Sequence, residues 1–287
     1  MLTLARNYRK VGQKGKTKMQ LREKIGGLFM VGFDGTTPPP SLVELIRDQF
    51  VGGVILYRRN IKSHQQLATL IDDIKSVAGD RPIFVAVDHE GGRVFRLPPP
   101  FTQIGPMAQV KNATTAYEVG KVMAKELLSA GFNINFTPVL DINTNVKNPI
   151  IGNRAFSHDA AVVASLGAQL IHGLQENGLI ACGKHFPGHG DTSLDSHYDL
   201  PRLAHTMKRL TEVELVPFTA AIEAGVKSIM TAHVIYDGID RACPATMSKA
   251  IINDLLRRRL GFDGVVFTDD LQMAAISRQF SMGEASL

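Results

Sequence analysis

The chain has 287 residues, of which 44% are hydrophobic and 21% charged, and its formal net charge is +5. This composition is typical of a folded globular protein and excludes collagen-like and fully disordered chains. The longest apolar runs, such as residues 178–183, are far shorter than the roughly 20 residues that a membrane-spanning helix needs. No apolar block follows the basic N-terminus as a secretion signal would require, so we expect a cytoplasmic protein without a membrane span.

The positive charge lies at one end of the chain. Residues 1–18 contain six Lys or Arg and no acidic residue, which leaves 26 basic against 27 acidic residues in the remainder. The main body therefore offers no general polyanion surface, and we expect no nucleic-acid partner. We expect residues 1–18 to be a disordered leader, or an upstream extension of a chain that starts at Met19, with an organelle signal or an RNA-binding arm as the alternative. Residues 19–287 are expected to form one catalytic domain.

Short β-branched or apolar runs alternate with amphipathic segments of helical length from Met19 onward. The expected strands are Leu28–Phe33, Gly53–Leu56, Ile83–Val87, Asn133–Phe136, Leu179–Gly183, Ser228–Ala232 and Gly264–Thr268. The expected helices are Ser41–Gln49, Ser63–Ala78, Thr114–Ala130, Asp159–Asn177, Thr211–Ala224 and Lys249–Leu260. Strands separated by helices run parallel. The pattern therefore predicts an α/β protein with either a doubly wound sheet or a (β/α)8 barrel of the TIM type.

The ends of the expected strands favour the barrel. No GxGxxG follows the first strand and no GxxxxGK[ST] is present, so we expect no nucleotide cofactor. Polar groups stand at or just past the carboxyl end of every strand, and a barrel brings those ends together at one mouth. These groups are Asp34, Tyr57, Arg58, Asp88, His89, Glu90, Asp141, Lys184, His185, His233, Asp269 and Asp270.

The number of strands raises a question of stability. We find seven strands, whereas a closed TIM-type barrel has eight. The expected fold is therefore a (β/α)8 barrel that lacks its last β/α unit. The alternatives are a barrel that is open by nature, or an eighth strand that the apolar pattern does not show. Two unpaired edges would expose apolar interior. We therefore expect the 287 residues to be marginally stable and weakly active, unless a second chain in an oligomer supplies the missing strand.

The densest chemistry lies in residues 184–197, KHFPGHGDTSLDSH. Asp195 stands two residues before His197, where its carboxylate can orient the imidazole as an acid/base pair. A second interpretation is a zinc site, although Pro187 prevents the first two histidines from sharing one helix face as HExxH requires. In this interpretation the ligands of the zinc ion would come from one loop and would be His185, His189, Asp191, Asp195 and His197. A third interpretation is a polar loop whose histidines are structural. We expect no metal, and two distant cysteines, Cys182 and Cys243, predict neither a disulfide nor a thiolate site.

Several segments together resemble one enzyme family. They are LFMVGFDG (28–35), GGVILYRRNI (52–61), VDHEGGRVFRL (87–97), NFTPVLDI (135–142), GNRAFS (152–157), KHFPGHGDTSLDSHYDLP (184–201) and VVFTDDLQM (265–273). In this order they resemble glycoside hydrolase family 3, in its bacterial β-N-acetylglucosaminidase branch. The resemblance implies a barrel glycosidase that removes terminal β-linked N-acetylglucosamine without a cofactor. Its implied natural substrates are saccharide fragments of peptidoglycan recycling.

The resemblance also implies roles for individual residues. The nucleophile would be Asp269, with Asp270 structural, and the general acid/base would be His197 paired with Asp195. A histidine, with an ordinary pKa near 6.5, is already poised between acid and base at neutral pH. Sugar binding would fall on Asp88, Arg96, Arg154, Lys184 and His185.

Two other functions stay open at this point. A histidine acid/base does not repel phosphate, so the same residues could form a phosphorylase that transfers the glycosyl group to phosphate. A non-catalytic sugar-binding or decayed relative is the second alternative. The chain departs from the branch in ending at GEASL (283–287), where known members continue into an eighth strand and its helix. It also lacks the second α/β domain of the β-glucosidase branch, which favours the single-domain group.

Overall fold

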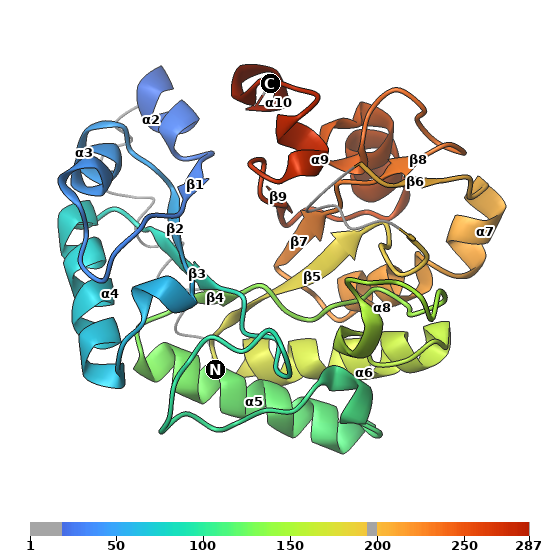
Figure 1. Cartoon of the computed structure of the whole chain (residues 1–287), viewed down its shortest axis with the longest axis horizontal. Coiled ribbons are helices and arrows are strands. Elements are labelled where there is room, and N and C mark those ends of the chain that lie inside the picture. The colour runs from blue at the N-terminus through green and yellow to red at the C-terminus, as the bar shows by residue number, and fades with distance from the viewer. Residues whose placement is uncertain (1–18, 194–199, 287) are drawn as a thin grey trace.

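A computed structural model describes residues 19–193 and 200–286 of the chain. Seven parallel strands form one sheet in the order β1-β2-β3-β4-β5-β7-β9. Their bounds are Met30–Val31, Gly53–Leu56, Phe84–Val87, Ile134–Asn135, Ile180–Phe186, Ser228–Thr231 and Val265–Thr268. Figure 1 shows that the strands follow one another around a curve whose two ends, β1 and β9, face each other. The expected seven strands and their parallel directions are confirmed, as a curled sheet with helices outside it.

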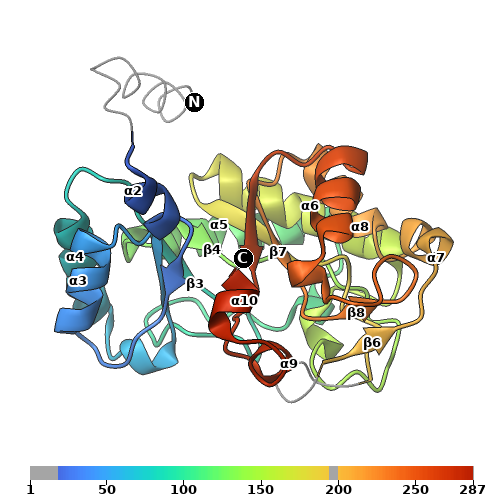
Figure 2. The ribbon, with the colours of Figure 1, turned by 90° about the horizontal axis from the view of Figure 1, so that it is seen from above.

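Helices cover the outside of the curled sheet (Figure 1). The helices among the described residues are α2 Leu21–Gly26, α3 Pro40–Asp48, α4 His64–Ala78, α5 Ala113–Ser129, α6 Ala160–Glu176, α7 Met207–Glu212, α8 Val216–Glu223, a π-helix Ala250–Arg259, α9 Ala274–Ser277 and α10 Met282–Ser286. Side chains of Ser63, Asn112 and Asp159 accept hydrogen bonds from the first backbone N–H groups of α4, α5 and α6. These caps explain why the helices begin close to the expected positions. Figure 2 shows α9 and α10 beyond the carboxyl end of β9.

Two expected elements differ from the structure. The single helix expected over Thr211–Ala224 is wrong, because α7 ends at Glu212 and α8 starts at Val216. Pro217 lies in the first turn of α8, where its missing N–H costs nothing, but its ring would clash with the carbonyl of residue 213 in a continuous helix. Strand β5 runs to Phe186, three residues beyond the expected end. A register shift between Gly183 and Phe186 lets it keep pairing with β7.

Burial differs along the sheet. Val85, Ala86 and Val87 of β3 are completely buried, and all but the first residue of β5 is buried. No residue of β9 is fully buried, and Val265 is 43% exposed. A small second sheet pairs β6, Arg202–Leu203, with β8, Ile235–Tyr236, beside the main one. Neither strand was among those expected from the sequence.

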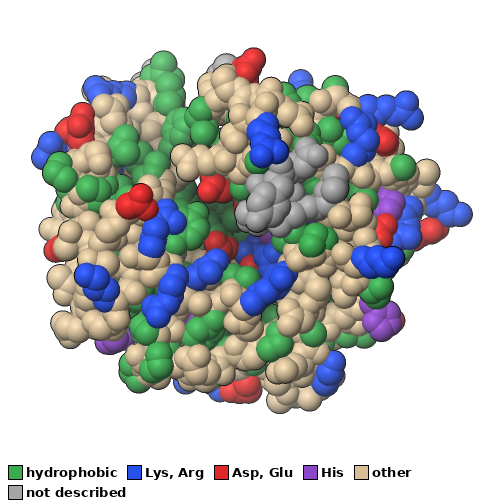
Figure 3. Space-filling view, viewed as in Figure 1, with side chains coloured by type: hydrophobic (Ala, Val, Ile, Leu, Met, Phe, Trp, Pro, Cys, Tyr) green, Lys and Arg blue, Asp and Glu red, His purple; other side chains and the backbone are tan. Residues whose placement is uncertain are grey.

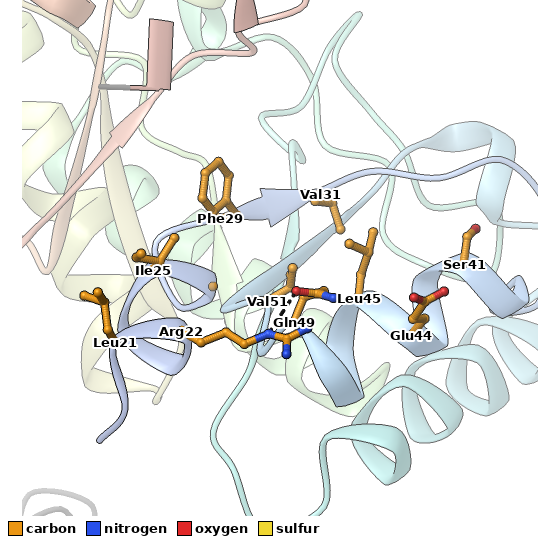
Figure 4. Close-up of a pocket in the computed structure, with 11 residues that line it drawn as sticks. Leu21, Arg22, Ile25, Phe29, Val31, Ser41, Glu44, Leu45, Gln49 and Val51 are labelled. Carbon is orange, nitrogen blue, oxygen red and sulfur yellow. Dashed lines mark hydrogen bonds between the residues drawn. The ribbon is translucent and has the colours of Figure 1, made fainter. Parts of the chain in front are cut away.

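An apolar groove of about 850 Å³ runs along the β1 side of the sheet, between α2, β1 and α3 (Figure 4). Leu21, Ile25, Phe29, Leu45 and Val51 line it. Within the described residues β1 pairs with β2 alone and β9 with β7 alone, so both ends of the curve keep an unpaired edge. Among these residues no helix is both long and apolar enough to cross a bilayer. Cys182 and Cys243 are both free.

Candidate active site

A lysine buried on β5 joins the ends of two strands. The Nζ atom of Lys184 lies 2.6 Å from an oxygen of Asp88 and 2.6 Å from an oxygen of Glu90, both of which follow β3. The Lys184 side chain is only 2% exposed. Burial alone would lower the pKa of Lys184, but the carboxylates of Asp88 and Glu90 outweigh it and raise the pKa, so the ammonium is charged. The expected meeting of strand ends is confirmed at this point, although Lys184 lies within β5 rather than after it.

Arg154 completes a network of two cations and two carboxylates. It lies in the short 3-10 helix Gly152–Arg154 and donates two hydrogen bonds of 2.8 Å to the two oxygens of Glu90. Burial opposes ionisation of Glu90, but Lys184 and Arg154 keep its pKa far below the ordinary value. The Glu90 side chain is 2% exposed and that of Asp88 is 20% exposed. Glu90 therefore fixes the two cations, whereas Asp88 is the carboxylate of the network that a ligand can reach.

A second buried carboxylate holds His185. Asp141 follows β4, and its Oδ2 atom lies 2.6 Å from Nδ1 of His185. The backbone N–H of His189 donates to the other oxygen of Asp141 at 2.6 Å. Burial raises the pKa of Asp141, but His185 and His189 outweigh it and lower the pKa. Asp141 therefore fixes the plane of the His185 ring and the start of the loop after β5.

Asp269 lies at the same end of the sheet, directly after β9. Its backbone N–H donates to the carbonyl of Thr231 at 3.3 Å, and its Oδ1 atom accepts from the N–H of Asp270 at 2.8 Å. Burial would raise the pKa of Asp269, but the nearby His185, His233 and Lys184 and the Asp270 N–H together lower it. Asp269 is therefore an ionised carboxylate, with no cation bound to it by a described contact.

The space around these groups is hollow and charged. Figure 3 shows acidic and basic side chains gathered around a depression near the middle of this face of the molecule. Tyr57, directly after β2, contributes a hydroxyl whose pKa is raised to about 12 by burial and by the carboxylates of Asp270 and Asp88. This hydroxyl is a neutral hydrogen-bond donor at every physiological pH. The sequence placed Tyr57 at a strand end but gave it no role.

Arg96 is not joined to this network by any contact among the described residues. Arg96 follows β3 and donates its backbone N–H to Nδ1 of His89 at 3.3 Å, while its buried Nε atom has no hydrogen-bond partner among the described residues. The expected acid/base pair, Asp195 and His197, lies outside the described residues. Within residues 19–193 and 200–286, no group of three or more His, Cys, Asp or Glu is arranged to hold a metal ion.

Sequence reasoning missed the residues that orient the others. Glu90 and Asp141 stand on the strand ends where polar groups were expected, but neither was assigned a role. Their position was the available signal. The sequence does not show which partner each of them contacts, because Glu90 and Arg154 are 64 residues apart and Asp141 and His185 are 44 apart.

A buried lysine-carboxylate network and a separate ionised carboxylate at the carboxyl ends of parallel strands define the site of an α/β enzyme. The chain matches the model of the glycosyl hydrolase family 3 N terminal domain over residues 20–287. It is 41% identical over 280 residues to a beta-hexosaminidase of Bordetella pertussis (strain Tohama I), an alignment that covers 93% of this chain and 77% of that protein. The chain therefore belongs to glycosyl hydrolase family 3, and the expected glycosidase class is confirmed.

Two solved structures agree with this assignment. A glycoside hydrolase family 3 beta-N-acetylglucosaminidase from Paenibacillus sp. str. FPU-7 has a TM-score of 0.91 and 42% sequence identity, over 93% of this chain and 52% of that chain. This chain thus spans about half the length of that protein. NagZ from Neisseria gonorrhoeae in complex with N-trifluoroacetyl-D-glucosamine has a TM-score of 0.81 and 36% identity, over 91% of this chain and 78% of that chain.

Proposed function

We propose that the protein is a retaining β-N-acetylglucosaminidase. The observation that carries this proposal is the position of Asp269, an ionised carboxylate whose low pKa depends on His185, His233 and Lys184. A retaining glycosidase needs such a carboxylate on one face of the anomeric carbon and a proton donor on the other. The similarity to a beta-hexosaminidase and to a beta-N-acetylglucosaminidase supports the sugar class.

In the first step an oxygen of Asp269 forms a bond to the anomeric carbon, and the bond from that carbon to the leaving oxygen breaks. His197, oriented by Asp195, gives its proton to the leaving oxygen. In the second step water attacks the same carbon, His197 takes a proton from the water, and the bond to Asp269 breaks. The sugar leaves with its original configuration, and both residues return to their starting state.

Sugar binding is assigned to the network at β3 and β5. Asp88, the partly exposed carboxylate, can accept two hydrogen bonds from neighbouring hydroxyls, and Lys184 holds it in place at 2.6 Å. Arg154, in the 3-10 helix Gly152–Arg154, and His185, within β5, are further candidate donors. Arg96 has a buried Nε atom available as a donor. The relative with bound N-trifluoroacetyl-D-glucosamine supports a site for N-acylated glucosamine.

We also propose the natural setting of this reaction. The curled sheet would belong to a (β/α)8 barrel, because its site residues gather at the carboxyl ends of its strands as they do in that fold. The substrates would be peptidoglycan fragments that end in N-acetylglucosamine, handled in the cytoplasm. Incubation of the protein with such fragments, and fractionation of cells that produce it, test these two points.

The proposed activity is tested with the purified protein and 4-nitrophenyl N-acetyl-β-D-glucosaminide, with the β-glucoside as the matched control. We expect turnover of the first substrate only, and proton NMR at early times should find the β-anomer of free N-acetylglucosamine. A product that starts as the α-anomer would contradict the retaining mechanism. Sugar 1-phosphate formed in phosphate buffer would identify a phosphorylase instead, and the absence of any turnover would contradict the proposal.

A further inference from the structure

A buried histidine outside the sugar-binding network contacts the turn that follows β9. His233 comes two residues after β7 and is completely buried. Its Nε2 atom lies 2.9 Å from the backbone carbonyl oxygen of Asp270, and its Nδ1 atom lies 2.8 Å from Oγ1 of Thr246. A carbonyl oxygen only accepts hydrogen bonds, so Nε2 carries the proton of the first contact. The ring therefore links β7 to the residue next to Asp269.

Thr246 contacts the His233 ring on the side opposite Asp270. Thr246, in the 3-10 helix Ala245–Met247, has its hydroxyl 3.1 Å from the hydroxyl of Thr231 and 3.1 Å from the carbonyl oxygen of Ala232. These three residues are buried: Thr231 ends β7, Ala232 follows it, and Thr246 lies in the short helix. The position of the His233 ring is thus determined by groups that do not move with the turn after β9.

The backbone of Asp270 connects the His233 ring to the Asp269 carboxylate. The N–H of Asp270 donates to Oδ1 of Asp269 at 2.8 Å, while its carbonyl accepts from His233 and from the N–H of Met273 at 3.0 Å. The Asp270 side chain accepts from the N–H of Gln272 at 2.8 Å, which closes the turn. Both backbone groups of Asp270 are therefore fixed, one to the Asp269 carboxylate and the other to His233.

This link matters because β9 gives the turn little support. Within the described residues β9 pairs with β7 alone, none of its residues is fully buried, and the Asp269 N–H reaches the Thr231 carbonyl only at 3.3 Å. A carboxylate must lie within a few tenths of an ångström of its attacking position to react efficiently.

We propose that His233 is a positioning residue that holds the Asp269 carboxylate in its attacking orientation by fixing the backbone of Asp270. This inference rests on the proposed function, because it requires Asp269 to be the nucleophile. His233 does not need to touch the sugar. Its loss is expected to slow formation of the glycosyl-enzyme while leaving the affinity for the sugar nearly unchanged.

Two substitutions at position 233 form a matched pair. In His233→Gln the amide nitrogen can occupy the place of Nε2 and still donate to the Asp270 carbonyl. In His233→Asn the amide reaches only the place of Nδ1, so the contact with Thr246 can remain while the contact with Asp270 is lost. We expect His233→Asn to lower kcat about 10-fold to 100-fold with KM within about 3-fold, and His233→Gln to stay within about 3-fold of the wild type in both.

The decisive measurement is the rate at which a slow-reacting, fluorinated N-acetylglucosaminyl fluoride modifies the protein. Mass spectrometry of the intact protein follows this modification over time. We expect this rate to fall in His233→Asn by the same factor as kcat and to be restored in His233→Gln. Thr246→Val, which keeps the volume but removes the hydroxyl behind Nδ1, should give a smaller loss, and it decides the matter if His233→Asn does not fold.

The outcomes separate the two claims. Wild-type protein that hydrolyses the nitrophenyl substrate but is never modified contradicts a covalent intermediate, and hence the proposed function. Wild-type protein modified on Asp269, together with His233→Asn and Thr246→Val modified at the wild-type rate, overturns the positioning role alone. Equal losses in His233→Asn and His233→Gln, or a loss that appears in KM, would also overturn it.

Discussion

The two halves of the site are held together in different ways. At β3 to β5, Asp88, Glu90, Arg154 and Lys184 form ion pairs of 2.6 to 2.8 Å around the buried side chains of Lys184 and Glu90. Asp269 is held by backbone hydrogen bonds directly after β9, a strand none of whose residues is fully buried. Buried charges must stay paired, because an unpaired partner costs several kcal/mol. We call the β3 to β5 network the binding half of the site; it is therefore rigid, and its ion pairs contribute to the stability of the fold. In the other half, a substitution of Asp269 has little effect on the free energy of unfolding.

This difference predicts that substitution of Asp269 affects activity but not stability. Asp269→Ala is expected to reduce kcat about 10⁴-fold or more, because no other group supplies the nucleophile. Its free energy of unfolding should stay within about 1 kcal/mol of the wild type, since Asp269 has no ion-pair partner among the described contacts. Urea denaturation and assay with the nitrophenyl substrate measure both quantities. Asp270→Asn serves as the neighbouring control, and an equal loss of activity there would contradict the assignment.

Substitution of Glu90 should have the opposite profile. Glu90→Ala leaves Lys184 and Arg154 without their shared carboxylate, and we expect it to lower the free energy of unfolding by about 3 to 5 kcal/mol. Glu118→Ala, which breaks an exposed pair with Lys121, is the matched control and should cost less than about 1 kcal/mol. Similar losses in the two variants would show that the buried network is not what stabilises the binding half.

The binding half should also make stability depend on pH. Burial, reinforced by the Arg96 guanidinium, lowers the pKa of His89 to about 4 in the folded protein, against about 6.5 in an unfolded chain. Between these values the unfolded chain binds a proton that the folded protein does not. The free energy of unfolding therefore decreases as the pH falls from 6.5 to 4, by about 3 kcal/mol for this group.

His89→Asn isolates that contribution. The amide oxygen can still accept the Arg96 N–H, but the side chain no longer titrates. Denaturation at pH 7 and pH 5 should find a smaller difference in His89→Asn than in the wild type, with His189, whose burial lowers its pKa to about 4, supplying the rest. An unchanged difference would mean that His89 is not held neutral by the fold.

The smallest expected effect concerns the acid/base pair and the quality of the leaving group. His197→Ala should lose about 100-fold more rate on alkyl glycosides, which need a proton on departure, than on nitrophenyl glycosides, which need little. Asp195→Asn should give a weaker version through misorientation of the imidazole. Comparison of kcat/KM on the two substrates measures this ratio, and equal losses on both would argue that His197 only binds the sugar.

The sequence predicted the sheet better than the contacts within the site. Apolar runs marked all seven strands, most clearly buried ones such as β3, and caps such as Asp159 marked helix starts. Periodicity alone did not separate α7 from α8, where Pro217 was the available signal, and it did not indicate β6 or β8. The positions of Asp88 and Lys184 at strand ends correctly predicted that these two residues lie close together. The roles of Glu90 and His233 escaped prediction because their partners are distant in sequence, and chain order does not say which side chains meet.

The central claim, that Asp269 at the weakly held end of the sheet is the nucleophile, has one direct test. The protein is treated with the slow fluorinated N-acetylglucosaminyl fluoride, digested, and its peptides are sequenced by tandem mass spectrometry. We expect one sugar per chain, attached to Asp269 in the peptide that contains FTDD, and no label in Asp269→Ala. A label on Asp270, or turnover by a protein that never acquires a label, would contradict it.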